Sequence, residues 1–320
     1  MVGLALALAL VVALVICLVV LVVGRRTGLV DRPDGELKTH TGAPVPLGGV
    51  AVLVAVQLGL VIGDAFDLQL LLASLVVLFL GLVDDVLGLS PRVRLIGAVV
   101  AGIVLVIGSE SVVHPIGRIA AIGLVTVAVN AVNLLDGLDA LAGSVSAVAA
   151  MGLASFAALG GVPGAWAPLT LTLALVGFLA FNYPPAKLYL GDNGAYVVGL
   201  TLAWAVLLAG ADWAGSIVAV ALIGVPFLDL AVTVLRRWRQ GKPLFAGDRD
   251  HSYDRLRSRD WSVVGVVTLF VAIQGVWAAV LILTSWKVGD LAAVTLALVL
   301  GGALSLYAVF RADAQVQAAD

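Results

Sequence analysis

The stretch from Val2 to Val23 reads VGLALALALVVALVICLVVLVV and contains no charged residue. A helix needs roughly 20 apolar residues to cross the hydrocarbon core of a bilayer. A cleavable signal peptide would have a basic start and a shorter apolar segment of about 7–15 residues. The stretch therefore predicts a transmembrane helix.

The rest of the 320-residue chain has the same character, with 62% hydrophobic and 12% charged residues. Soluble domains carry roughly 25% charged residues, so the composition predicts a membrane protein. A net charge of −2 gives no reason to expect a nucleic acid partner. Cys17 is the only cysteine, which excludes an intramolecular disulfide and a cysteine-based metal site.

Apolar runs separated by glycine, proline and charged residues predict a polytopic all-α protein with about eleven membrane spans. Helices are expected because backbone groups in lipid must be paired within the segment, and the runs lack the alternation of a barrel strand. The predicted spans are Val2–Val23, Leu47–Ile62, Leu68–Val83, Val93–Ile107, Ile119–Leu135, Leu141–Leu159, Trp166–Phe181, Ala195–Ala209, Ala214–Leu235, Val263–Thr284 and Leu291–Phe310.

The basic residues predict the orientation of these spans. If the N-terminus is outside, the inner segments hold all of the 18 lysines and arginines except Arg118 and Lys287. The positive-inside rule then predicts an N-out, C-in topology. We expect one transmembrane catalytic domain over residues 1–320.

The inner loops also hold most of the polar, glycine and proline residues. The first, DRPDGELKTHTGAPVPLGG (31–49), contains Lys38 and His40. The second, GLVDDVLGLSPRVRL (81–95), places two adjacent acids where a span ends, followed by Arg94 within reach of a phosphate. Neighbouring residues on a helix point about 100° apart, so Asp84 and Asp85 are expected to have different roles.

The third inner segment, NAVNLLDGLDALAG (130–143), has polar residues three positions apart at Asn130, Asn133, Asp136 and Asp139. On a helix, any three neighbouring members would share a face of roughly 120°, which is enough to line one pocket. Amides and carboxylates without a compensating cation suit a hard cation such as Mg²⁺. The alternative is that asparagine joins neighbouring membrane helices, which explains one such residue more easily than four.

The last two inner loops add an acid and a basic cluster. In FNYPPAKLYLGDNGAY (181–196), Asp192 precedes a span, where capping by Asp192 or Asn193 is the alternative to a ligand role. The loop from 236 to 261 has eight basic residues interleaved with four aspartates and His251. It would anchor the protein at an anionic leaflet. Acids for a metal and basic groups for phosphate on one membrane side are typical of phosphoryl transfer.

In this order the five motifs resemble those of the polyprenyl-phosphate N-acetylhexosamine-1-phosphate transferases (glycosyltransferase family 4). The resemblance covers about residues 31–256, and 263–320 would form two further transmembrane helices and a tail. It implies that a UDP-sugar, with N-acetylglucosamine favoured, donates its sugar phosphate to polyprenyl phosphate and releases UMP. The expected cofactor is Mg²⁺, with Mn²⁺ as an alternative. The expected location is the plasma membrane, with a cytoplasmic active site, and a homodimer is left open.

The resemblance also implies roles for individual residues. Asp84 and Asp85 would be the catalytic acids, one of which deprotonates or orients the lipid phosphate, and Asp192 and Asn133 would hold the metal. Nucleotide or sugar contacts would come from Asn130, Asp136, Asp139, Asn182, Lys187 and His251. Phosphate contacts would come from Lys38, Arg94 and Arg255.

This chain departs from the family pattern in three places. The last motif usually reads His-x-His-His-Arg-Leu, but Tyr253 and Asp254 stand where two histidines are usual. Ala195 replaces a usual serine, and Arg94 replaces a usual lysine. The missing histidines count against the phospho-N-acetylmuramoyl-pentapeptide transferase branch. A secondary transporter is the rival from another class, but its charged groups would lie near the bilayer midplane on repeated halves.

Overall fold

The computed structural model describes residues 1–316 except 32–42, 108–113, 211 and 244–249, with only the backbone for 302 and 305–316. The described part is helical, apart from one isolated β-bridge between Val45 and Leu188. Its helices are α1 Val2–Thr27, α2 Gly48–Ile62, α3 Leu68–Leu87, α4 Pro91–Val106, α5 Pro115–Leu135, α6 Leu141–Leu159, α7 Pro168–Asn182, α8 Gly191–Ala209, α9 Trp213–Ala221, α10 Gly224–Arg239, α11 Ser252–Arg257, α12 Val263–Val288 and α13 Asp290–Val316.

The multi-pass architecture is confirmed. Six described helices are long and apolar enough to cross a membrane, and the bent pair α9–α10 would make a seventh span. Three shorter apolar helices, Gly48–Ile62, Pro168–Asn182 and Asp290–Gly301, coincide with further predicted spans. The count of eleven spans and the N-out, C-in orientation remain predictions.

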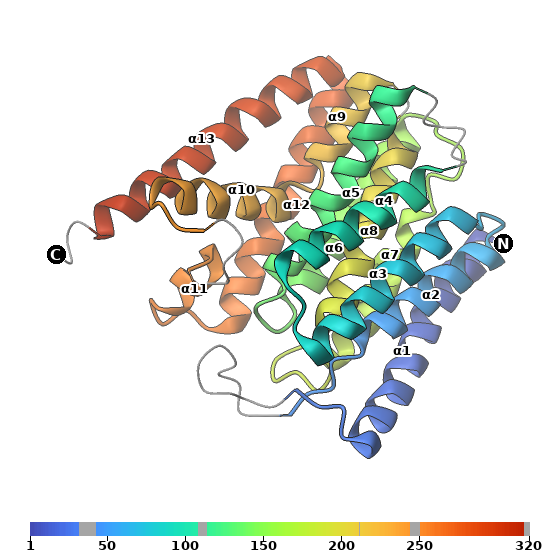
Figure 1. The fold of residues 1–320 in the computed structure, drawn as a ribbon. Coiled ribbons are helices and arrows are strands. Elements are labelled where there is room, and N and C mark those ends of the chain that lie inside the picture. Colours follow the sequence, from blue (N-terminus) through green and yellow to red (C-terminus); the bar gives the residue numbers. More distant parts are fainter. Residues whose placement is uncertain (32–42, 108–113, 211, 244–249, 317–320) are drawn as a thin grey trace.

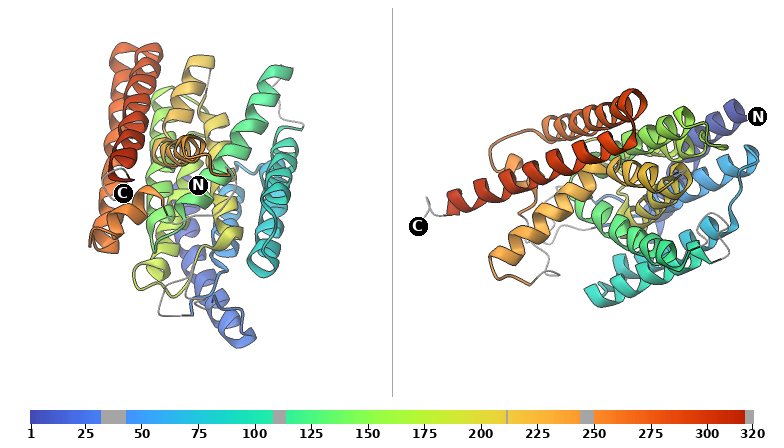
Figure 2. Two further views of the ribbon diagram at one scale, coloured as in Figure 1. Left: turned by 60° about the vertical axis from the view of Figure 1, so that its left-hand side comes forward. Right: turned by 90° about the horizontal axis from the view of Figure 1, so that it is seen from above.

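Helix α8 runs through the middle of the bundle, with α2, α3, α5 and α6 packed around it (Figure 1). Close approach to α5 depends on Gly199, because a Cβ atom there would lie 2.6 Å from the Ala128 carbonyl oxygen. Small residues bring membrane helices together in this way, since lipid offers no hydrophobic force between them. Figure 2 shows α12 and α13 along one flank of the bundle, with α4 on the opposite side.

The predicted span Ala214–Leu235 is broken into the two helices α9 and α10. The chain bends by 76° between α9 and α10. The polar backbone groups at the bend are satisfied by α12: Gln274 accepts from the Val225 N–H at 3.0 Å and donates to the Leu222 carbonyl at 2.8 Å, and Trp277 Nε1 donates to the Ala221 carbonyl at 2.7 Å. A broken helix is tolerated at membrane depth where neighbouring helices satisfy its backbone. The break turns α10 away from the bundle axis (Figure 2).

Candidate active site at one end of the bundle

The segments that precede α2 and α8 are far apart in the sequence, but they pair with each other at one end of the bundle. The Tyr189 N–H donates to the Val45 carbonyl at 2.9 Å, and the Gly48 N–H donates to the Tyr189 carbonyl at 3.0 Å. These bonds place the start of α2 beside the start of α8. The ends of α3 and α5 lie there too, because Asp85 and Asn133 both contact the first residues of α8.

Asp84, at the C-terminal end of α3, is buried and fully hydrogen-bonded. Its Oδ1 accepts from the Leu89 N–H at 2.7 Å, and its Oδ2 accepts from the Tyr196 hydroxyl at 2.7 Å and from Arg94 Nε at 2.8 Å. A carboxylate at a helix C-terminus opposes the helix dipole and needs such partners. Asp84 thus ties α3 to α4 and α8, and it engages the Arg94 guanidinium that was predicted to bind phosphate.

Asp85 points in another direction, as the angle between neighbouring helical residues requires. Its two oxygens accept from the backbone N–H groups of Asp192 at 2.9 Å and of Asn193 at 3.3 Å, and from the Asn193 side-chain amide at 2.6 Å. The first N–H groups of a helix have no partner within the helix. The N-terminus of α8 is therefore capped from α3 by Asp85, and not by the side chain of Asp192 or Asn193, as the alternative reading held.

Asp192, the second residue of α8, extends toward α5. Its Oδ1 accepts a hydrogen bond from the Asn133 amide at 2.5 Å. The predicted pair of metal-site residues is thus in direct contact, although the residues are far apart in the sequence.

Of the four polar residues, only Asn130 and Asn133 lie on α5, so the helical face that neighbouring members were expected to share does not extend to Asp136 and Asp139. Helix α5 ends at Leu135, and the following turn contains Gly137 and Ala140, the latter with a left-handed φ of 64°. Glycine costs about 1 kcal/mol in a helix, so the helix gives way to a turn there. Asn130 donates to the Thr126 carbonyl of its own helix at 2.7 Å.

The turn is fixed to the loop that precedes α8. Asp139 Oδ2 accepts from the Ala186 N–H at 2.9 Å. Asn182 is buried; it accepts from the Ala140 N–H and donates to the Leu188 carbonyl, both at 2.9 Å. These two predicted nucleotide-site residues therefore also shape the loops around the site.

Negative charge is concentrated beside this turn. Burial raises the pKa of Asp136 well above its usual range, and the charges of Asp192, Asp85 and Asp139 raise it further. These acids come from three helix ends and one turn, yet they are close enough to interact through their charges. A site of this kind favours a cation.

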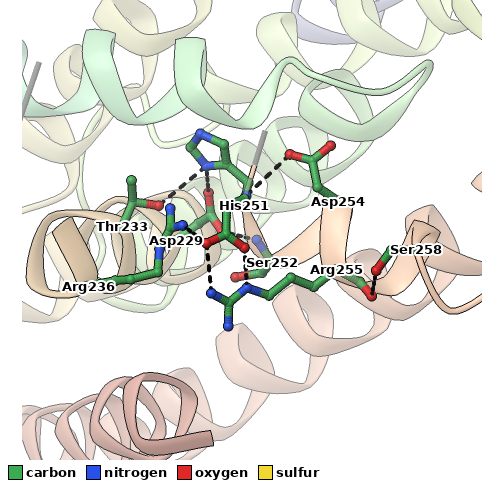
Figure 3. Close-up of polar contacts among 9 residues, drawn as sticks. Asp229, Thr233, Arg236, His251, Ser252, Asp254, Arg255 and Ser258 are labelled. Atoms are coloured by element: carbon green, nitrogen blue, oxygen red, sulfur yellow. Dashed lines mark hydrogen bonds and ion pairs between the residues drawn. The ribbon is translucent and has the colours of Figure 1, made fainter. Parts of the chain in front are cut away.

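A second polar cluster lies on α10 and α11 (Figure 3). His251 Nδ1 lies 3.1 Å from Asp229 Oδ2 and 3.3 Å from the Thr233 hydroxyl. Such a carboxylate favours the tautomer with hydrogen on Nδ1 and fixes the ring orientation. The Asp254 carboxylate accepts from the His251 backbone N–H at 3.2 Å, which begins α11 with a capping box.

Arg255 belongs to the same cluster, where it forms an ion pair with Asp250. Asp250 accepts two hydrogen bonds from Arg255, at 2.7 and 3.0 Å, and it also pairs with the buried Arg236. Burial alone would raise the pKa of Asp250, but the hydrogen bonds and charges of Arg255 and Arg236 lower it. The predicted contact of Arg255 with phosphate remains a prediction, and it would compete with this ion pair.

Tyr253 joins the second cluster to the first. Its ring stacks on His251 with 5.3 Å between ring centroids, and its hydroxyl donates to the Leu134 carbonyl at 3.1 Å. A Cβ atom at residue 137 would lie 2.1 Å from that hydroxyl, so a larger residue than glycine would require the Tyr253 side chain to move. The tyrosine at a usual histidine position is therefore packed between α11 and the end of α5.

The two lysines that were predicted to contact the nucleotide or phosphate are Lys187 and Lys38. Lys187 is exposed and has no side-chain hydrogen bond or ion pair among the described residues. Lys38 lies outside the described residues. The sequence patterns gave no ligand or positioning role to Asn193, Tyr196 or Asp229. The only signal for Tyr196 and Asp229 was that each is a polar residue within a predicted apolar span.

The side chains at this site can be compared with the ligands that a divalent cation requires. No three acidic, histidine or cysteine side chains in the described ranges lie close enough to form a metal cage. Mg²⁺ does not require one, because it usually binds one or two carboxylates together with waters and substrate phosphates. Asp192 and Asn133, with Asp136 close enough to interact, fit that mode of binding.

Helices that cross a membrane and loops that bring acids, amides and arginines together at one end describe a membrane-embedded transferase. The chain belongs to glycosyl transferase family 4, whose family model matches residues 68–210.

Curated relatives agree with this family. The chain is 33% identical over 275 residues to a protein of Streptomyces coelicolor described as a glycosyltransferase, which covers 81% of this chain and 66% of the relative. It is 30% identical over 283 residues to the decaprenyl-phosphate N-acetylglucosaminephosphotransferase of Mycobacterium tuberculosis (75% and 70% covered). It is 27% identical over 267 residues to the undecaprenyl-phosphate alpha-N-acetylglucosaminyl 1-phosphate transferase of Thermotoga maritima (83% and 81% covered).

Proposed function

We propose that this protein transfers N-acetylhexosamine 1-phosphate, with N-acetylglucosamine as the sugar, from its UDP derivative to a polyprenyl phosphate. The products are polyprenyl-diphosphate-sugar and UMP. The observation that carries the proposal is the contact of Asp85, Asp192 and Asn133 at one end of the bundle. The polyprenyl phosphate and the N-acetylglucosamine are those in the names of the Mycobacterium tuberculosis and Thermotoga maritima relatives, and the UDP carrier is what the motif resemblance implies.

The chemistry requires one bond to form and one to break. An oxygen of the polyprenyl phosphate attacks the sugar-bearing phosphorus of the donor, and the bond from that phosphorus to the UMP oxygen breaks. A phosphate monoester has a second pKa of about 6, so the acceptor is largely ionised at neutral pH. The reaction therefore depends more on positioning and charge stabilisation than on removal of a proton.

The hydrogen bonds suggest distinct roles for the acids. Asp192 and Asn133 would hold Mg²⁺, or Mn²⁺, together with the donor diphosphate, with the Asp136 carboxyl close by. When bound, the cation neutralises charge on the transferring phosphate. Asp84 and Asp85 already accept three hydrogen bonds each, so their part is to hold Arg94 and the start of α8 in place.

The second cluster would contact the sugar or its phosphate. Asp229 orients His251, and Tyr253 fixes α11 against the end of α5. Because Tyr253 and Asp254 are used in internal contacts, His251 is the candidate proton donor or acceptor of this motif. This supports the N-acetylglucosamine branch over the muramoyl-pentapeptide branch.

The basic inner loops support a cytoplasmic position for this end of the bundle. In the predicted topology, the ends of α3 and α5 and the start of α8 all face that side of the membrane. Protease-accessible tags on the 89–90 turn, tested in sealed right-side-out and inverted vesicles, would decide the side.

The test is a reconstituted assay. Purified protein in liposomes with polyprenyl phosphate is given a panel of UDP-sugars, and UMP release and the mass of the lipid product are measured. We expect product from UDP-N-acetylglucosamine, no reaction with EDTA, and a loss of about 100-fold or more in Asp192→Asn. Lys287→Ala is the control, because Lys287 lies in the last turn of α12 and belongs to neither polar cluster. No lipid product from any UDP-sugar, or full activity in Asp192→Asn, would overturn the proposal.

A further inference from the structure

Asn193 lies where α2, α3 and α8 meet, one residue after Asp192. Its side chain is fully buried. The amide Nδ2 donates to Asp85 Oδ2 at 2.6 Å and to the Pro46 carbonyl at 2.7 Å, and the backbone N–H donates to Asp85 at 3.3 Å. One amide thus joins the acid of α3 to the chain segment that leads into α2.

Three glycines form a close-fitting space around this residue. A Cβ atom at Gly81 would lie 2.2 Å from Asn193 Cα, one at Gly49 would lie 2.3 Å from Oδ1, and one at Gly191 would lie 2.6 Å from Nδ2. Gly191 also has a left-handed φ of 72°. The side chain therefore has little room for another rotamer, and its amide is held in one orientation.

The consequence for Asp85 is a fixed carboxylate. Of its three hydrogen bonds, Asn193 supplies two and the Asp192 backbone supplies the third. Asp85 in turn anchors the backbone of Asp192, whose side chain reaches Asn133. A chain of contacts therefore leads from the Asn193 amide to the proposed metal-site carboxylate without Asn193 touching that carboxylate.

We infer that Asn193 is a positioning residue that fixes Asp85 and, through the first turn of α8, the Asp192 carboxylate. The inference rests on the proposed function, because it assigns Asn193 an effect on divalent-cation affinity. Groups that hold a metal ligand in place typically change metal affinity about 10–100-fold when they are removed.

The chemistry of the site explains why an amide is required. Both partners of Nδ2 are acceptors, so the side chain must donate two hydrogen bonds. Aspartate has the same shape but would place a third acceptor against the Asp85 carboxylate and the Pro46 carbonyl. Serine can donate one hydrogen bond, and alanine none. The expected order of cation affinity is asparagine, serine, alanine and then aspartate.

Binding of Mn²⁺ to the purified protein, followed by electron paramagnetic resonance, tests this order without an activity measurement. We expect the dissociation constant for Mn²⁺ to rise about 10–100-fold in Asn193→Ala, less in Asn193→Ser and most in Asn193→Asp. Thr201→Val is the matched control, because Thr201 is a buried polar residue of the same helix. Among the described residues, its hydroxyl bonds only to the Val197 carbonyl. Turnover with UDP-N-acetylglucosamine should show the same order in the Mg²⁺ concentration needed for half-maximal rate.

The outcomes separate the two proposals. If the parent protein binds no Mn²⁺, the proposed metal site fails. If the parent binds Mn²⁺ and folded Asn193→Ala binds it equally well, the role of Asn193 fails. Loss of folded protein in both Asn193→Ser and Asn193→Ala would also contradict the inference, because it would assign Asn193 to folding and not to positioning.

Discussion

The ion pair between Asp84 and Arg94 gives the sharpest stability prediction, because the Asp84 side chain is buried and the Arg94 side chain is partly exposed. The Asp84 side chain is 0% exposed, whereas that of Arg94 is 34% exposed. Removing Arg94 leaves a buried carboxylate without its cation, whereas removing the charge of Asp84 leaves an arginine that water can reach. The two variants should therefore differ in the free energy of unfolding.

The hydrogen bonds give the magnitudes. Arg94→Met leaves Asp84 with the Leu89 N–H and the Tyr196 hydroxyl only, and breaking a buried pair in this way typically costs about 3–5 kcal/mol. Asp84→Asn keeps one acceptor and loses a hydrogen bond to a charged group, which costs about 1.5–3 kcal/mol. The arginine variant should be the less stable of the two.

The assay is unfolding of the purified protein in mixed micelles by increasing sodium dodecyl sulfate, followed by circular dichroism. Arg92→Met is the matched control, since it removes the same charge from the exposed side of the same helix. If Asp84→Asn were more destabilising than Arg94→Met, or if both behaved like Arg92→Met, the assignment of a buried, pair-dependent carboxylate would be refuted.

Three further predictions concern other parts of the molecule. Gln274→Met should leave the Val225 N–H and the Leu222 carbonyl without partners at the bend, at about 1–3 kcal/mol for each buried group in the same unfolding assay. Ile273→Val, at the exposed neighbouring position, is its control, and equal stability of the two variants would contradict the role of Gln274. Gly81→Ala should abolish folding or activity because its Cβ would overlap the α8 backbone, so wild-type yield and turnover would contradict the packing. The pKa of Asp250 is lowered by Arg255 and Arg236, so its stabilising effect is present at neutral pH and is lost as pH falls through that lowered value. Asp250→Asn should therefore be less stable than the parent at pH 7 and should approach it in acid, as unfolding across pH would reveal.

The long apolar helices could be predicted from the sequence because the bilayer requires them. The ends of α3, α5 and α8 were predicted to within a few residues, and with them the site of Asp84, Asp85 and Asp192. The bend between α9 and α10 could not be predicted, because it depends on Gln274 and Trp277 of a helix far along the chain. Hydropathy identifies an apolar run, but it does not show which side chains elsewhere in the chain bond to the backbone of that run.

The partners of the site residues were likewise outside the reach of sequence patterns. Spacing of three suggested that neighbouring polar residues between Asn130 and Asp139 share a helical face, but the turn after Leu135 leaves Asp136 and Asp139 outside the helix. The capping of α8 by Asp85 joins residues more than 100 positions apart in the chain. The different directions of the Asp84 and Asp85 side chains were predictable, because neighbouring side chains on a helix diverge.

We propose that Asp192 lies where a cation and the donor diphosphate meet. Electron–nuclear double resonance of Mn²⁺ with UDP-N-acetylglucosamine bound to the protein measures this directly, through coupling of the metal to the phosphorus nuclei. We expect phosphorus coupling in the parent protein and its loss in Asp192→Asn. Equal coupling in the two proteins would contradict it.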